Sequence, residues 1–175
     1  MKFVTSNANK LRELRIHLPN LEQLDIDLPE IQSLDPYEII TAKLEAAREH
    51  TNEDIIVEDT SLTLTCLGRL PGPFIKHFLA ELTANGIVEL ASHYDNQHAT
   101  ARTIIGYATS DHVEFFEGTV EGRIVPSRGD VAFGWDGIFE PEGYEKTYAE
   151  LGDEKHTMSH RARAIEKLLS HVQNE

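Results

Sequence analysis

Two adjacent carboxylates, Glu58 and Asp59, follow directly after the short apolar run 55–57. Such a run is typical of a buried strand, and open α/β sheets bind their ligands at the carboxyl ends of the strands. A carboxylate pair at this position suits a hard divalent cation. Because neighbouring side chains of a strand point to opposite faces, the sequence leaves two arrangements open. Either Asp59 faces the site with Glu58 behind it, or the reverse.

A rigid turn and a lysine come after the acid pair. The turn over residues 70–73, with the sequence LPGP, has two prolines that fix φ and a glycine that permits close approach. It leads into a helix predicted over 74–82 and places Lys76 in the first turns of that helix. An acid pair, a stiff turn and a lysine together predict a phosphate site with a bound metal. The alternative interpretation is a strand-end turn with solvated acids.

Residues 5–10, with the sequence TSNANK, form a predicted junction between a strand at the N-terminus and a helix that ends near Leu18. Free backbone N–H groups at a helix start bind phosphate well, and Lys10 adds a positive charge. The glycines of a Walker A loop are missing, and no GxGxxG pattern occurs. The alternative interpretation is plain N-capping of the helix by Asn7 or Asn9.

Two further charged candidates lie between these segments. Residues 24–28 alternate between apolar and acidic types, which predicts a half-exposed strand, and Glu30 follows in a loop. A helix is predicted from an N-cap at Asp35 to about His50, and it carries Lys43. Taken alone, Glu30 is an ordinary solvated loop acid, and Lys43 is one helix lysine among exposed neighbours.

A hairpin and a glycine-rich loop are predicted in the second half of the chain. Residues 100–109 and 112–122 are rich in β-forming types and are separated by a tight-turn signal. The segment 126–144 is loop-like and contains the sequence FGWD at 133–136. The aromatic side chains of that sequence either stack on a ligand such as a purine ring or fill the core.

The helices of the second half show one unusual feature at their ends. The dipeptide 85–86, Asn-Gly, is expected to end the helix over 74–82, with a short helical turn over 87–92 after it. The last helix is predicted over 159–172 and begins with His160 and Arg161. Cations at a helix start oppose the helix dipole, so this unfavourable placement indicates a functional role.

Composition restricts the class of protein. The chain has 175 residues and 40% hydrophobic content, which suits a single domain over residues 1–175. Strands alternate with helices and a hairpin follows, which predicts an α/β fold with a mixed sheet. The net charge of −14 argues against a nucleic-acid-binding surface. It does not exclude a small anionic substrate, because a few lysines and a divalent cation reverse the local field.

Cysteine use and hydropathy predict a cytoplasmic protein without a membrane partner. The single cysteine, Cys66, allows no intrachain disulfide and fits a reducing compartment. No apolar run approaches the roughly 20 residues of a membrane span, and the N-terminus has no signal-peptide pattern. The nine histidines form neither an HExxH pattern nor a cluster with cysteine, so a zinc site is not expected.

Taken together, these separate signals resemble the inosine triphosphate pyrophosphatase family, whose members remove non-standard purine nucleoside triphosphates. The similar pieces occur in the family's order over nearly the whole chain. They are TSNANK at 5–10, DLPEIQ at 27–32, Lys43, VEDTSL at 57–62, LPGPFIK at 70–76, FGWD at 133–136, YAEL at 148–151 and SHR at 159–161.

The resemblance implies an elongated, two-lobed mixed α/β fold with a nucleotide cleft between the lobes, and a homodimer. It implies Mg²⁺, with Mn²⁺ as an alternative, held by Glu30 and Asp59, and it gives Asp59 the role of general base. The phosphate-facing positions it implies are Thr5, Ser6, Asn7, Asn9, Lys10, Lys43, Thr60 and Lys76. The base- and ribose-facing positions it implies are Phe133, Gly134, Trp135, Asp136, Lys155, His160 and Arg161.

The expected reaction is the hydrolysis of ITP, dITP or XTP to the nucleoside monophosphate and pyrophosphate. Three positions depart from the family pattern: Ser6 replaces a glycine of the phosphate turn, Gly137 replaces a proline after FGWD, and His156 replaces an asparagine. Base preference is the property these departures affect most. Two rival interpretations are a related pyrophosphatase for pyrimidine or modified nucleotides, and a nucleotide-binding regulatory module without turnover.

Overall fold

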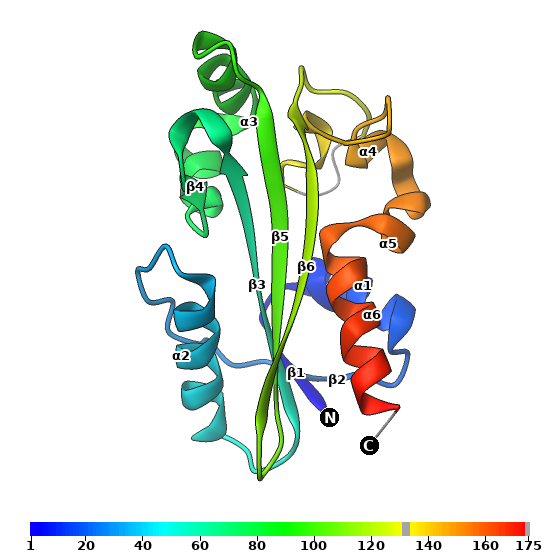
Figure 1. Ribbon diagram of the computed structural model, residues 1–175. Helices are drawn as coiled ribbons and strands as arrows, with labels where there is room; N and C mark the ends of the chain where they lie inside the picture. The colour runs from blue at the N-terminus through cyan, green and yellow to red at the C-terminus, as the bar shows by residue number, and fades with distance from the viewer. Residues whose placement is uncertain (131–133, 174–175) are drawn as a thin grey trace.

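A mixed β-sheet runs through the whole molecule. The computed structural model describes residues 1–130 and 134–173, and seven strands of this described part join in one sheet. The order is β2-β1-β3-β5-β6-β7, with β4 paired to β3. β3, β5 and β6 are long and antiparallel, whereas β1 lies parallel to both β2 and β3 (Figure 1). The α/β fold with a mixed sheet, predicted from the sequence, is confirmed.

The elements have the following bounds. The strands are β1 (Lys2–Val4), β2 (Glu22–Leu24), β3 (Ile55–Leu64), β4 (Pro71–Gly72), β5 (His98–Ala108), β6 (Val113–Ile124) and β7 (Phe139–Pro141). The α-helices are α1 (Ala8–His17), α2 (Pro36–Arg48), α3 (Ile75–His93), α4 (Tyr148–Leu151), α5 (Lys155–Met158) and α6 (His160–Val172). Short 3₁₀ turns occupy Thr65–Leu67, Asp136–Ile138 and Gly152–Glu154. In the described part of the chain, no helix combines the length and apolar character needed to cross a membrane.

One edge of β3 is interrupted in the middle. The other edge pairs with β5 along the whole strand. On the interrupted edge, β1 pairs only with Ile55 and Ile56, and β4 pairs only with Leu62 and Thr63. Between these two pairings, the register of the described strands leaves residues 57–61 without a neighbouring strand. This gap contains both carboxylates of the predicted acid pair.

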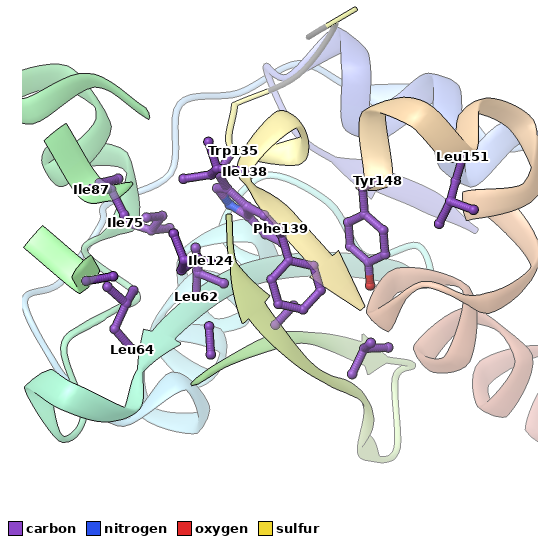
Figure 2. Packing of buried hydrophobic residues seen from close by; sticks show 14 residues of the cluster. Leu62, Leu64, Ile75, Ile87, Ile124, Trp135, Ile138, Phe139, Tyr148 and Leu151 are labelled. Atoms are coloured by element: carbon purple, nitrogen blue, oxygen red, sulfur yellow. The ribbon is translucent and has the colours of Figure 1, made fainter. Parts of the chain in front are cut away.

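The helices pack around the sheet as two lobes that share β3, β5 and β6 (Figure 1). In the lower lobe, α2 covers one face of the sheet, and α1 and α6 cover the other. Alternation along β3 explains this, because Ile56 packs with the α1 and α6 side while Ile55 and Val57 pack with the α2 side. In the upper lobe, Trp135, Phe139 and Tyr148 fill the space between α3 and α4 (Figure 2).

Most of the predicted elements are confirmed. The helix after the N-terminal turn ends at His17, α2 starts at Pro36 after an Asp35 N-cap, and α6 starts after a Ser159 N-cap. The hairpin predicted over 100–122 is the pair β5 and β6.

Two strand predictions were wrong in their bounds. The strand predicted over 24–28 ends at Leu24, because its neighbour β1 ends at Val4 and no other described strand pairs with it beyond that point. The run 55–57 was expected to end before the acid pair, but β3 continues through both acids to Leu64, because β5 pairs with it throughout. Glu58 and Asp59 therefore lie in mid-strand and not at a strand end.

The structure also differs from prediction in the second half of the chain. The break in α3 lies at Thr83 (φ 63°, ψ 172°) and not at Asn85-Gly86. After this kink Gly86 returns close to Leu82, so close that an added Cβ would lie 3.0 Å from the Leu82 Cβ. The segment 126–144, predicted to be a loop, contains the strand β7 because its residues 139–141 pair with β6.

Helix α6 approaches the sheet closely at Gly118 of β6. A Cβ at Gly118 would lie 1.9 Å from the backbone oxygen of His160 and 2.5 Å from the backbone nitrogen of Ala164. Both are backbone atoms that cannot rotate away. The glycine thus allows the first turn of α6, with His160 and Arg161, to lie directly on β6.

We expect Gly118→Ala to destabilise the protein by about 3 kcal/mol, the upper end of the range for overpacking, since the clash is with backbone. Chemical denaturation measures this change in the free energy of unfolding. Gly86→Ala is the control, because the atom nearest to its added Cβ is the Cβ of Leu82, at 3.0 Å, and not a backbone atom. Equal losses in the two variants would show that close packing of α6 is not what Gly118 provides.

Candidate functional site

A cavity of about 790 Å³ lies at the interrupted edge of β3, between the two lobes. Its lower wall consists of the N-terminal turn, the segment 26–32 and α2. Its upper wall consists of the start of α3 and the loop residues Gly134 and Trp135. The predicted site residues that line it are Thr5, Ser6, Asn7, Lys10, Glu30, Lys43, Asp59, Thr60, Lys76, Gly134 and Trp135. Phe133 lies outside the described residues. The cavity thus brings together most of the predicted positions from six separate segments.

The N-terminal turn is held by its own side chains. The Thr5 hydroxyl accepts the Asn7 amide at 3.0 Å, and the Asn7 side-chain oxygen accepts the amides of Asn9 and Lys10 at 3.0 and 3.2 Å. Asn7 is therefore the N-cap of α1, one of the two capping residues considered from the sequence. Asn9 does not line the cavity. The capping bonds fix the turn that aims Lys10 at the cavity.

The acid pair divides between two faces of β3, as alternation requires. Asp59 forms an ion pair with Lys43 at 2.7 Å. Glu58 points to the other face, where its fully buried carboxylate binds Lys10 at 3.2 Å and the Arg161 Nε at 2.8 Å, and it too is among the residues that line the cavity. Thr60 donates to the same carboxylate at 2.7 Å. Although burial raises the pKa of Glu58, the charges of Arg161 and Lys10 outweigh it and hold that pKa far below its usual range.

Asp59 keeps one oxygen available. Its Oδ1 binds Lys43, whereas its Oδ2 is buried and has no hydrogen-bond partner among the described residues. A buried carboxylate oxygen without a partner is costly, so its presence at a cavity indicates a ligand.

A divalent cation fits this chemistry. Among the described residues, no group of three or more His, Cys, Asp or Glu side chains is arranged to hold a metal. Mg²⁺ usually binds to one or two carboxylates and to substrate phosphates, and does not need an all-protein cage. Asp59 Oδ2 is one carboxylate oxygen that can take this role. Glu30 is the second candidate, at the cavity wall, where it lies 3.5 Å from Lys76 with both side chains exposed.

Arg161 and Lys155 do not line the cavity but lie behind it in a buried network of charges. Arg161 donates to Glu58 and also to Glu13 of α1. Lys155 binds Glu13 at 3.2 Å and Asp136 at 2.6 Å. Burial raises the pKa of Glu13, but Arg161 and Lys155 outweigh it and lower that pKa; burial dominates at Asp136, whose pKa is raised.

The aromatic residues form a buried stack next to this network. Trp135 packs against the His160 ring at 5.3 Å between centroids, and His160 packs in turn against Tyr148 at 5.7 Å. Trp135 lines the cavity, but His160 does not. Burial, together with the charges of Arg161 and Lys155, holds the pKa of His160 well below its usual value, so the ring is neutral. This neutrality removes one of the two unfavourable cations that the sequence suggested at the start of α6. The other, Arg161, stays charged and is compensated by Glu58 and Glu13.

The sequence did not single out Glu13, Asp27 or His77. Asp27 and His77 line the cavity, and Glu13 is the shared partner of Lys155 and Arg161. The available signal for Glu13 was its position three residues after Lys10, which places both on one face of a helix. No signal in the sequence pairs Glu13 with residues more than 140 positions away.

We expect Glu13→Gln to destabilise the protein by about 3 kcal/mol, because removing one partner leaves buried cations without their compensating charge. The exposed Glu45→Gln on α2 is the matched control, for which a change within about 0.5 kcal/mol is expected. Urea unfolding of the three proteins measures both changes. Equal stabilities of the Glu13 variant and its control would contradict the importance of the buried network.

Known proteins similar to this chain identify its family. The model of the Ham1 family matches residues 1–171. An inosine triphosphate pyrophosphatase of Yarrowia lipolytica is 41% identical over 173 residues, which cover 95% of this chain and 92% of that protein.

Solved structures show the same fold. The Ham1 protein of Staphylococcus aureus has a TM-score of 0.84 at 25% identity and 99% coverage of both chains. A HAM1 protein from Coxiella burnetii has a TM-score of 0.83 at 25% identity and full coverage of both chains. A nucleoside-triphosphatase, described as a dITP/XTP pyrophosphatase, from Mycobacterium abscessus has a TM-score of 0.74 at 25% identity, covering 97% of this chain and 99% of its own. The resemblance noted in the sequence is thereby confirmed, and the chain belongs to the Ham1 family.

Proposed function

We propose that this protein hydrolyses the non-standard purine nucleoside triphosphates ITP, dITP and XTP to the nucleoside monophosphate and pyrophosphate. The named relative with 41% identity supports this activity. The observation that carries the proposal is the cavity itself, which gathers Lys10, Lys43 and Lys76 around Asp59, whose Oδ2 is free for a ligand. The lining also holds the carboxylates Asp27, Glu30, Glu58 and Asp59. Three lysines beside carboxylates that can bind a metal suit a triphosphate with a bound cation.

The three lysines come from the starts of α1 and α3 and from the middle of α2. We assign them to the phosphates, with the hydroxyls of Thr5, Ser6 and Thr60 and the amide of Asn7 as further contacts. Asn9 belongs to the same turn, as the second residue of α1. Fixed cations stabilise the charge that grows on the phosphoryl oxygens when water attacks the α-phosphorus in line. Ser6 is exposed, so its side chain need not block the turn.

We assign a divalent cation, Mg²⁺ with Mn²⁺ as an alternative, to Asp59 and Glu30. When bound, such an ion neutralises phosphate charge and lowers the pKa of a coordinated water. Of the two carboxylates that the sequence left open, Asp59 is the better general base. Its Oδ2 has no partner among the described residues, whereas Glu58 is fully buried and bound to two cations that stabilise its ionised form.

We assign the nucleoside to the aromatic end of the cavity. Trp135, with Phe133, Gly134 and Asp136 of the same loop, would hold the base and ribose. Lys155, His160 and Arg161 lie behind Trp135 as hydrogen-bond donors for O6 of a 6-oxo purine, and adenine offers no acceptor at that position. The departures Gly137 and His156 lie beside these groups in the sequence, where they would influence base preference.

The remaining inferences come from the resemblance and the composition. We infer one domain over residues 1–175, a homodimer, a cytoplasmic location and no nucleic-acid or membrane partner.

The first test is a hydrolysis panel of dITP, XTP, dGTP, dATP and dUTP with Mg²⁺, with pyrophosphate and orthophosphate assayed separately. We expect pyrophosphate from dITP and XTP and little product from the others. Preference for dUTP would favour a pyrimidine pyrophosphatase. Orthophosphate would place the attack on the γ-phosphorus. Binding without hydrolysis would favour a regulatory module.

We expect Asp59→Asn to lower kcat by about 10²–10³-fold, the loss typical of one charge-stabilising group, and to leave the fold intact. Asp111→Asn, in the exposed turn between β5 and β6, is the control and retains activity. Glu58→Gln should lose stability as well as activity, because Lys10 and Arg161 would lose their shared carboxylate. Steady-state kinetics and thermal unfolding separate the two effects, and near wild-type turnover in the Asp59 variant would refute its role.

A further inference from the structure

Tyr148, the first residue of α4 and of the sequence YAEL, is buried beside the base end of the cavity and has no role in the reaction as described so far. Its ring is 1% exposed and lies nearly parallel to the His160 ring, with an interplanar angle of 17°. Its hydroxyl lies 3.4 Å from His160 Nδ1. Lys155 Nζ lies 5.5 Å from the centre of the Tyr148 ring. Tyr148 thus contacts two of the residues assigned to the purine.

The His160 ring holds a single proton, because its burial and its cationic neighbours keep it neutral. A neutral imidazole is a donor at one nitrogen and an acceptor at the other. The nitrogen that carries the proton decides what His160 Nε2 offers to a ligand.

The surroundings of the Tyr148 hydroxyl select one tautomer. The phenol stays protonated, since burial raises its pKa, and the backbone amide of His160 acts on the same oxygen as a donor. If Nδ1 also donated to this oxygen, the phenol proton would have no acceptor among the described residues. If the phenol donates to Nδ1, every one of these groups is satisfied. The second arrangement places the imidazole proton on Nε2.

His160 Nε2 is buried and has no hydrogen-bond partner among the described residues. In the selected tautomer it is an N–H donor without an acceptor, which costs free energy unless a ligand supplies one. The ring of Trp135, which stacks on the His160 ring, lines the cavity. An oxygen at C6 of a purine can accept this hydrogen bond, whereas the 6-amino group of adenine presents further donors.

We propose that Tyr148 is a positioning residue: it fixes His160 as an Nε2 donor, and so makes the site select purines with oxygen at C6. The proposal rests on the function proposed above and adds to it a physical origin of base selectivity. Tyr148 does not touch the substrate and acts through His160.

The first measurement needs no substrate. Long-range proton–nitrogen correlation spectra of the protein labelled at histidine show which ring nitrogen carries the proton, and His160→Gln assigns the signals. We expect the proton of His160 on Nε2 in the wild type. A proton on Nδ1 in the wild type would overturn the proposal whether or not any variant folds.

The second measurement compares kcat/KM for dITP and dATP. Tyr148→Phe keeps the ring and removes the hydroxyl, so we expect the dITP-to-dATP ratio to fall by about 10–100-fold, the effect of one mismatched buried hydrogen bond. The same variant should shift the His160 proton from Nε2 toward Nδ1. The matched control is Tyr107→Phe, which removes the hydroxyl of a tyrosine buried in the lower-lobe core, and it should keep the wild-type ratio.

The possible outcomes distinguish a failure of the proposed function from a failure of the role proposed for Tyr148. A wild type without preference for dITP would refute the proposed function. A wild type that prefers dITP, with an unchanged ratio in Tyr148→Phe, would overturn the role of Tyr148 alone. A fall in the ratio without a change of the His160 tautomer would also overturn it, since the loss would then reflect packing.

Discussion

The structure depends most on the ion pairs that Arg161 forms with Glu58 and Glu13. These three side chains come from α6, β3 and α1, and all are almost fully buried. Burying charges in this way contributes little net stability, and replacing them with apolar residues often stabilises a protein. Their arrangement is better explained by position, because Glu58 also holds Lys10 at the phosphate end while Glu13 also holds Lys155 at the base end. One network therefore fixes cations at both ends of the site that we propose for the nucleotide.

The second constraint is the interrupted edge of β3. A continuous neighbouring strand would fill the space where the cavity lies, and its backbone would cover Asp59. Because β1 ends at Val4 and β4 begins only at Pro71, the two lobes meet at an open stretch of strand, and the cavity opens there. The pairing with β5 keeps this open stretch straight, so that Glu58 and Asp59 stay on opposite faces. Rigid backbone thus separates the carboxylate that is bound to Lys10 and Arg161 from the one whose Oδ2 has no partner among the described residues.

Local patterns predicted local structure well. Asp35-Pro36 and Ser159 mark helix starts, and β-forming residue types on both sides of a tight-turn signal mark the hairpin, because capping, propensity and turn chemistry act within a few residues. The bounds predicted for the strands at Leu24 and at 55–57 were wrong, because the length of a strand depends on neighbouring strands that the sequence does not identify. The same holds for the site. The sequence indicated the lysines and the acid pair, but the roles of Glu13 and Tyr148 depend on contacts with α5 and α6, which only the folded chain brings together.

The buried arrangement also explains why the base end is more demanding than the phosphate end. Lys76 and Glu30 form an exposed ion pair at 3.5 Å, and such a pair contributes little and tolerates change because solvent screens it. Arg161, Lys155 and His160 are shielded from water. Each of them has a hydrogen-bond partner within the protein when no base is bound. A base that presents acceptors to this group gains hydrogen bonds, whereas one that presents donors leaves buried donors facing each other. In the proposed site, we therefore expect selection between bases at the buried end and affinity for the triphosphate, which all these nucleotides share, at the exposed end.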